Sequence, residues 1–351
     1  MKIDFEPIAS VGDAEEVLAL IEIRTLFYPS TYVGDLEWDE DQLLASFIDQ
    51  LDDPGLRQDY LGEPAAGVDE AKNRLLSDLY VLIEQRHGTL KANTPFEWNF
   101  ADGLLLARRD RRALNAASLG YLWLSLYWLL VSDKNYLVVE EPDRKEFLRQ
   151  FANVFEQICC YAISGQSENV VWYLGDSRSS AEFLRRLETV TAACGNGAAK
   201  RPDQLEAHQI GANDAGVDVL AIETHDGEIR HNALTHLVGV TIQQASRRNK
   251  VMGVDQRNRF TGYFEREPLL TYNGVLAVPF DRSENDELTC RDNNCLYLAK
   301  DEIVKNLGRV AVNMAGAGLR RPGSKLLRAT SALRAKVRLA DNDEDRAINW
   351  A

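Results

Sequence analysis

Two short apolar runs near residue 230 carry polar side chains that could do chemistry. The first, GVDVLAIE at 216–223, has Asp218 near its start, and the second, LVGVTIQQAS at 237–246, has Gln243 near its end. If the two runs are neighbouring strands, the carboxylate and the amide oxygen can converge at one edge of a sheet. Oxygen ligands of this kind suit Mg²⁺. The pattern therefore predicts a divalent-cation site held by Asp218 and Gln243.

Cations follow the second run directly. Arg247, Arg248 and Lys250 are placed where they could meet a phosphate or a developing negative charge. Because arginine keeps its proton at neutral pH, Arg248 would only stabilise charge, whereas Lys250 is not so restricted. A structural interpretation of the first two residues stays open: Asp218 could cap a turn after the NDAG segment, and Gln243 could make an ordinary buried hydrogen bond.

Strand and helix patterns alternate around these runs. Amphipathic spacing predicts a helix at 143–163 that begins with a capping aspartate, and further helices at 180–191 and from residue 300. Apolar runs predict strands at 168–175, 216–223, 237–245, 274–280 and 294–298. This order predicts an α/β fold around a mixed sheet. Residues 1–140 instead show helical spacing through most of their length, including one or two helices within 100–132.

The most apolar segment is AASLGYLWLSLYWLLV at 116–131. It is shorter than the roughly 20 residues that a membrane span needs, so we expect a buried core helix. The first residues, MKIDFE, lack the basic start and apolar run of a signal peptide. The five cysteines are too few and too scattered for a disulfide framework, and Cys290 and Cys295 lack the further ligands of a zinc site. We expect a cytoplasmic protein.

Charge is segregated along the chain. Residues 1–70 hold three basic and eighteen acidic residues, whereas residues 303–340 hold nine Lys or Arg and no Asp or Glu. Solvated helix faces would explain both segments. The functional interpretation is a phosphate-binding C-terminal surface that includes Arg320, Arg321, Lys325 and Arg328. The acidic first segment would then contact a partner protein or shield the basic surface.

At GVDVLA, GVTIQQAS and GVLAVPFDR (274–282) the sequence resembles the restriction-endonuclease-like PD-(D/E)xK nucleases. It looks like a variant branch in which glutamine replaces the second acid and the lysine has moved downstream. The resemblance covers roughly residues 143–310. It implies that Asp218 binds the metal, that Gln243 stands for the second acid, and that Glu156 on the preceding helix adds a carboxylate. The position of the usual lysine is Ala245, so Arg248 or Lys250 would replace it, with Arg247 beside them.

The resemblance implies a restriction-endonuclease-like mixed sheet flanked by helices (141–310). A mostly helical, acidic regulatory or partner-binding domain (1–140) precedes it, and a basic extension with an acidic tail (311–351) follows. It further implies Mg²⁺- or Mn²⁺-dependent hydrolysis of nucleic acid, first of all DNA, in bacterial restriction or phage defence. The alternatives are an inactive subunit of the same fold that binds nucleic acid or a partner, and an interaction module that works through its acidic segment. Homo-oligomer formation stays open.

Overall fold

The structure is a computed structural model, and it describes the residues 2–3, 14–27, 31–32, 40–49, 51–90, 93–99, 104–107, 116–131, 137–138, 141–175, 177, 179–210, 215–242, 251, 253–280, 284–309 and 338–339. The chain forms two compact units. One comprises Met1–Arg144 together with Arg328–Ala351, and the other comprises Lys145–Leu327.

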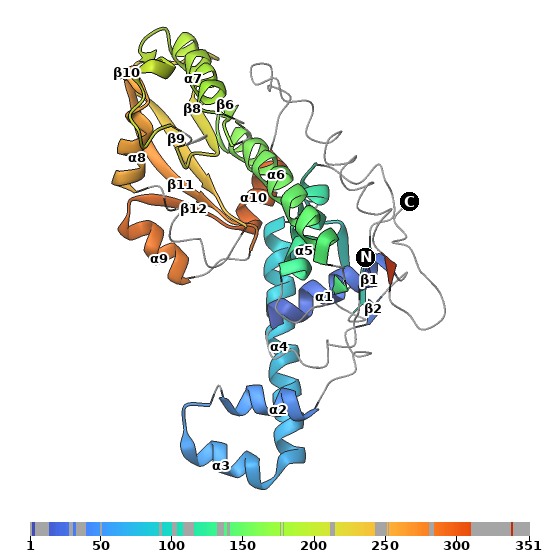
Figure 1. The fold of residues 1–351 in the computed structure, drawn as a ribbon. Coiled ribbons are helices and arrows are strands. Elements are labelled where there is room, and N and C mark those ends of the chain that lie inside the picture. The colour runs from blue at the N-terminus through green and yellow to red at the C-terminus, as the bar shows by residue number, and fades with distance from the viewer. Residues whose placement is uncertain are drawn as a thin grey trace. The chain divides into compact units, whose positions relative to one another are not determined.

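The unit Lys145–Leu327 is built on a five-stranded mixed sheet (Figure 1). In spatial order its strands are β12 (Cys295–Leu298), β11 (Leu270–Ala277), β9 (Ala233–Val240), β8 (Val219–Glu223) and β6 (Asn169–Tyr173). Strand β8 runs antiparallel to both β6 and β9, whereas β9, β11 and β12 are parallel. One edge of the sheet therefore collects the ends of β6, β9, β11 and β12 and the start of β8. We call it the Asp218 edge, because Asp218 directly precedes β8.

Strand β8, between β9 and β6, is apolar on both faces over residues 219–222. Val219, Leu220, Ala221 and Ile222 are at most 1% exposed. A strand that is buried on both faces reads as a continuous apolar run rather than as an alternating one. Strand β8 is therefore covered on both sides, and the polar residues next to this run, Asp218 and Glu223, lie at its two ends.

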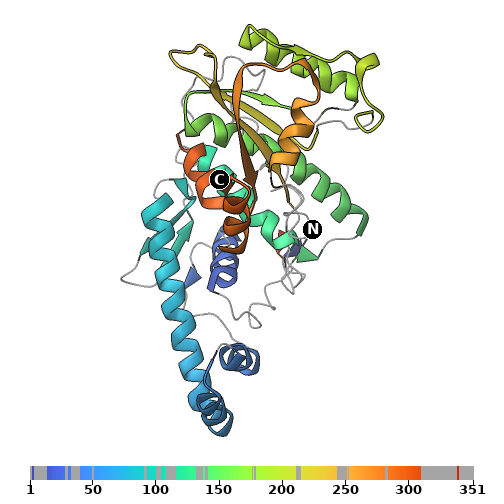
Figure 2. The same ribbon diagram turned by 90° about the vertical axis from the view of Figure 1, so that its left-hand side faces the viewer.

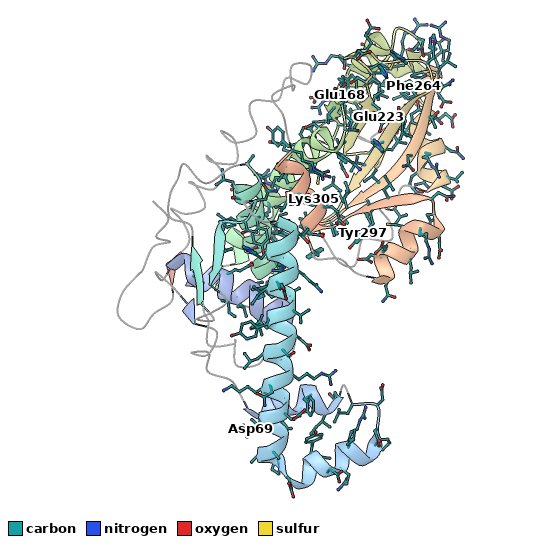
Figure 3. All side chains as sticks on the ribbon, turned by 180° about the vertical axis from the view of Figure 1, so that it is seen from behind. Asp69, Glu168, Glu223, Phe264, Tyr297 and Lys305 are labelled. Carbon is teal, nitrogen blue, oxygen red and sulfur yellow. The ribbon has the colours of Figure 1, made fainter. Side chains whose placement is uncertain are left out.

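Helices flank this sheet. They are α6 (Glu141–Gln166), α7 (Ser180–Cys194), α8 (Val254–Thr261), α9 (Glu284–Asp292) and α10 (Lys300–Leu307). A short 3₁₀ turn (Pro202–Gln204) and a small antiparallel pair, β7 (Ala198–Ala199) with β10 (Phe264–Arg266), complete the described part of the unit. Figure 3 shows the two ends of the sheet: Glu168, Glu223 and Phe264 lie at the end away from the Asp218 edge, whereas Lys305 belongs to α10, which follows the end of β12.

The other unit is mostly helical. Its helices are α1 (Ala14–Phe27), α2 (Glu40–Asp49), α3 (Pro54–Gly62), α4 (Pro64–Leu90) and α5 (Ala116–Val131). Its short strands form two three-stranded sheets: β2 (Thr31–Tyr32), β4 (Leu104–Ala107) and β3 (Phe96–Asn99), and β13 (Arg338–Leu339), β1 (Lys2–Ile3) and β5 (Leu137–Val138). Figure 2 shows α2 and α3 at the same end of the long helix α4.

The buried residues of α4 include four that recur at intervals of four positions and so form one stripe along the helix. Ala71, Leu75, Leu79 and Ile83 are at most 6% exposed, as expected for residues that share one helix face.

A buried cluster of polar side chains joins α1, α4 and α5. The hydroxyl of Tyr121 donates to both carboxylate oxygens of Glu22 at 2.7 Å and accepts from Arg86 Nη1 at 3.1 Å.

The predicted fold class, a mixed sheet flanked by helices after a mostly helical region, is confirmed in the described residues. Helix α6 and strands β8 and β9 follow one another in the predicted order, and Asp218 directly precedes β8. Among the described helices, none has the length and apolar composition of a membrane span. Helix α5 agrees with the expectation of a core helix, since Tyr121, Leu122 and Tyr127 are at most 1% exposed.

Three details of the predicted elements were wrong. Residues 104–107 form a strand that pairs with Phe96–Asn99, although this region was predicted as helix. The short run LLLA has no periodicity that separates helix from strand. Helix α6 begins at Glu141, so Asp143 lies inside the helix and is not its cap. Strand β9 begins at Ala233, four residues before the predicted start, because it pairs with β11 from Leu270 onward, and residues 243–245 of the predicted strand lie outside the described residues.

Candidate metal centre

Asp218 is fixed between the ends of three strands. Its Oδ2 accepts the N–H of Val240, at the end of β9, at 2.7 Å, and its carbonyl oxygen accepts the N–H groups of Leu174 and Gly175, just after β6, at 2.8 and 3.0 Å. Asp218 is 3% exposed. Because backbone groups of both neighbouring strands hold it, the carboxylate has little freedom to turn. The alternative interpretation, in which Asp218 caps a turn after the NDAG segment, stays a prediction, because Asn213 and Asp214 of that segment lie outside the described residues.

Glu156 reaches the same place from helix α6. The hydroxyl of Tyr173, the last residue of β6, donates a short hydrogen bond to Glu156 Oε2. Glu156 is half-buried, whereas Cys159 and Cys160 further along the helix are fully buried. The helix thus brings its carboxylate to the border between the covered sheet and the solvent.

Gly175 marks the point where the two carboxylates converge. A Cβ atom at this glycine would lie 2.8 Å from Glu156 Oε2 and 3.3 Å from Asp218 Oδ1. These two oxygens therefore border the same small space beside the Cα of Gly175. Val240 binds the other oxygen of Asp218, so Oδ1 is the atom that faces this space. The lack of a side chain at residue 175 is what leaves the space open.

The electrostatics of the neighbouring thiol indicate the same cluster. Burial is the main cause that raises the pKa of Cys159, and the charges of Cys160, Glu156 and Asp218 raise it further. Both carboxylates thus act on one buried atom. Two negative charges that border the same small space repel each other, and a divalent cation between them would offset that repulsion.

Arg186 on α7 holds the strand end that carries Tyr173. Its Nη1 donates to the carbonyl oxygen of Tyr173 at 2.8 Å, and its Nη2 pairs with Glu182 at 2.8 Å. The guanidinium also lies over the Tyr173 ring, 5.9 Å from its centre. Tyr173 is therefore constrained at both its ring and its backbone, and it in turn constrains Glu156.

The donor set fits a hard divalent cation. Glu156 Oε2 and Asp218 Oδ1 are carboxylate oxygens, which Mg²⁺ and Mn²⁺ prefer, and Mg²⁺ completes its shell with several waters. Within the described residues, no group of three or more His, Cys, Asp or Glu side chains is arranged to hold a metal. The candidate site therefore has two protein carboxylates, those of Glu156 and Asp218, among the described residues.

Of the residues predicted for the site, the structure brings Asp218 and Glu156 together. The other predicted site residues lie outside the described residues: Gln243, Arg247, Arg248, Lys250, Arg320, Arg321, Lys325 and Arg328. Sequence reasoning missed Tyr173 and Gly175. Their only signal was position, since YLG ends the strand predicted at 168–175 and precedes a polar loop.

No protein-family model and no curated protein sequence matches the chain. Among solved structures, the chain is similar to the MspJI restriction endonuclease in complex with a 27-mer oligonucleotide. That match has 13% sequence identity and a TM-score of 0.26, and it covers 64% of this chain and 38% of the other. A likeness at this level leaves the function to be argued from the geometry of the Asp218 edge.

Proposed function

We propose that this protein is a metal-dependent nuclease that hydrolyses phosphodiester bonds of DNA at the Asp218 edge. The observation that carries the proposal is the convergence of Asp218 Oδ1 and Glu156 Oε2 on the space beside Gly175. The resemblance to the PD-(D/E)xK nucleases supports it, because a metal-binding aspartate at the head of a strand and a first-helix glutamate are what that resemblance implies at these two residues.

Asp218 and Glu156 would hold Mg²⁺ or Mn²⁺. When bound, such an ion supplies positive charge to the phosphate and acidifies the attacking water. Asp218, which the backbone of β6 and β9 fixes, sets the position of the site, and Glu156, which Tyr173 orients, closes its second side. Gln243 would add an uncharged oxygen ligand. Arg248 would stabilise the negative charge that develops on the phosphate, and Lys250 could do the same.

The cellular role that we propose is bacterial restriction or phage defence. In this role the basic C-terminal segment, with Arg320, Arg321, Lys325 and Arg328, binds nucleic acid together with Arg247. The acidic N-terminal region recruits a protein partner or shields the basic segment. Residues 1–70 carry eighteen acidic and three basic residues, and this imbalance supports that part of the proposal.

A cleavage assay with the full chain tests the proposal. Double-stranded DNA, single-stranded DNA and RNA are incubated with Mg²⁺, with Mn²⁺ and with EDTA. We expect metal-dependent cleavage of DNA that Asp218→Ala abolishes. Because Asp218→Ala also leaves the N–H of Val240 without its acceptor, at a cost of about 1–3 kcal/mol, Asp218→Asn is the matched variant that keeps an acceptor oxygen.

Binding of Mn²⁺, measured by electron paramagnetic resonance, gives a second readout that does not need a substrate. Wild type should bind Mn²⁺ at the site and both Asp218 variants should not. If wild type and variants are equally inert and bind no metal, yet bind DNA with a steep salt dependence, the protein is instead a non-catalytic nucleic-acid-binding subunit of the same fold.

A further inference from the structure

Helix α6 carries Glu156 on a stripe of residues that leads away from the site. With about 3.6 residues per turn, positions 145, 149, 156, 160 and 163 fall on one side of the helix. Along this stripe Ile163 and Cys160 are fully buried, Glu156 is half-buried, and Arg149 and Lys145 are exposed. The same side of α6 thus passes from the covered sheet, through the carboxylate pair, to solvent.

We propose that Arg149 and Lys145 bind the phosphate backbone of DNA next to the scissile phosphate. The inference rests on the proposed function, because it takes the carboxylate pair of Glu156 and Asp218 as the point of cleavage. It adds a substrate-binding surface, which we call the α6 track and define as these two residues.

The spacing along the helix fits a polyanion. At about 1.5 Å per residue, Arg149 lies roughly 10 Å and Lys145 roughly 17 Å from Glu156 along the axis of α6. Successive phosphates of one strand rise about 3.4 Å along a duplex, so these distances span the few phosphates that flank the cleaved one. The α6 track therefore places its two positive charges beside the positions that the negatively charged phosphates of a DNA strand would take as it leaves the site.

The chemistry of the two side chains suits this role. Arginine presents a planar fork that can bind two phosphate oxygens at once, and lysine acts as a mobile point charge. A cation site alone attracts any phosphate, whereas a row of charges beside it favours a chain of phosphates. The α6 track therefore favours a polynucleotide over a mononucleotide.

A salt titration of DNA binding tests the α6 track. A fluorescein-labelled duplex is titrated with the full chain in EDTA, which prevents cleavage, over a range of KCl concentrations, and the anisotropy gives the affinity. We expect the double variant Lys145→Gln/Arg149→Gln to bind at least tenfold more weakly at low salt. The slope of log K against log[KCl] should fall by about 2, since each neutralised phosphate contributes about 0.9.

Two controls separate charge from folding and from general electrostatics. Lys145→Arg/Arg149→Lys keeps both charges and should retain the wild-type slope. Arg259→Gln removes an exposed cation at the other end of the sheet and should also leave the slope unchanged. Arg259 lies there because Phe260, its neighbour in α8, packs on Tyr272 near the start of β11.

Binding and cleavage are measured separately, so the two proposals fail separately. Two outcomes would overturn the α6 track. In one, the double glutamine variant binds the duplex with the wild-type salt slope; in the other, wild type does not bind the duplex at all. If the double variant shows the expected loss but wild type never cleaves, the track stands and the nuclease proposal fails. If wild type cleaves DNA but the double variant has the same salt slope as wild type, the nuclease proposal stands and the α6 track fails.

Discussion

Gly175→Ala is the substitution that most directly probes the carboxylate pair. The added methyl group would lie 2.8 Å from Glu156 Oε2 and 3.3 Å from Asp218 Oδ1. Because an ordinary contact of a carbon atom is about 3.5 Å, the Glu156 carboxylate has to move by roughly 0.5–1 Å. Asp218 cannot yield instead, since Val240 and the backbone after β6 hold it in place.

The expected effect on function is large and the effect on stability is small. A misplacement of about 1 Å at a catalytic group costs on the order of 100-fold in rate, and we expect that loss of cleavage activity for Gly175→Ala. The affinity for Mn²⁺ should fall at least tenfold, because the methyl occupies the space that the two oxygens border. Crowding costs about 1–3 kcal/mol, whereas replacing glycine by alanine returns about 0.4–1 kcal/mol through the unfolded chain. The free energy of unfolding should therefore fall by no more than about 2.6 kcal/mol.

The assay measures cleavage rate, Mn²⁺ affinity and thermal unfolding for wild type, Gly175→Ala and a control, Gly88→Ala. Gly88 lies within helix α4, and a methyl group added there would have no neighbouring atom within 4 Å. The control substitution should therefore stabilise the protein by about 0.5–1 kcal/mol without touching the site. Wild-type Mn²⁺ affinity in a folded Gly175→Ala variant would refute the reasoning, because a cation could then not lie between the two carboxylates.

Three further substitutions probe single interactions. Tyr173→Phe removes the donor to Glu156 and should weaken Mn²⁺ binding about tenfold while the melting temperature stays near wild type; unchanged affinity would argue against an orienting role. Tyr121→Phe removes a donor from the buried carboxylate of Glu22 and should lower the free energy of unfolding by about 1–3 kcal/mol. Thermal unfolding measures this loss, and an unchanged unfolding transition would contradict the prediction. Burial lowers the pKa of His236 below 6.5, so the unfolded chain binds more protons than the folded one between that lowered pKa and 6.5. Wild type should therefore lose stability as the pH falls below 6.5 and His236→Gln should lose less; parallel curves of unfolding free energy against pH would disprove this.

Local pattern was enough to predict much of the sheet unit. The apolar runs that became β6, β8 and β12 have few polar interruptions, and helix α10 begins at Lys300, where the spacing indicated. Such runs are readable because a buried strand must be apolar over its whole length. Pattern failed where a run was short, as at Leu104–Ala107, or where pairing with another strand set the limits, as in β9.

The sequence by itself determined which residues could serve as ligands. Asp218 stands alone at the start of an apolar run, and Glu156 lies on an amphipathic helix, so both could be named as candidates from type and position. It could not show that Gly175 lies beside both carboxylates, nor that Tyr173 binds Glu156, because these contacts join residues 17 to 43 positions apart in the chain. Only the tertiary structure decided them, since the antiparallel pairing of β6 with β8 and the packing of α6 beside the strand ends bring the four residues to one edge.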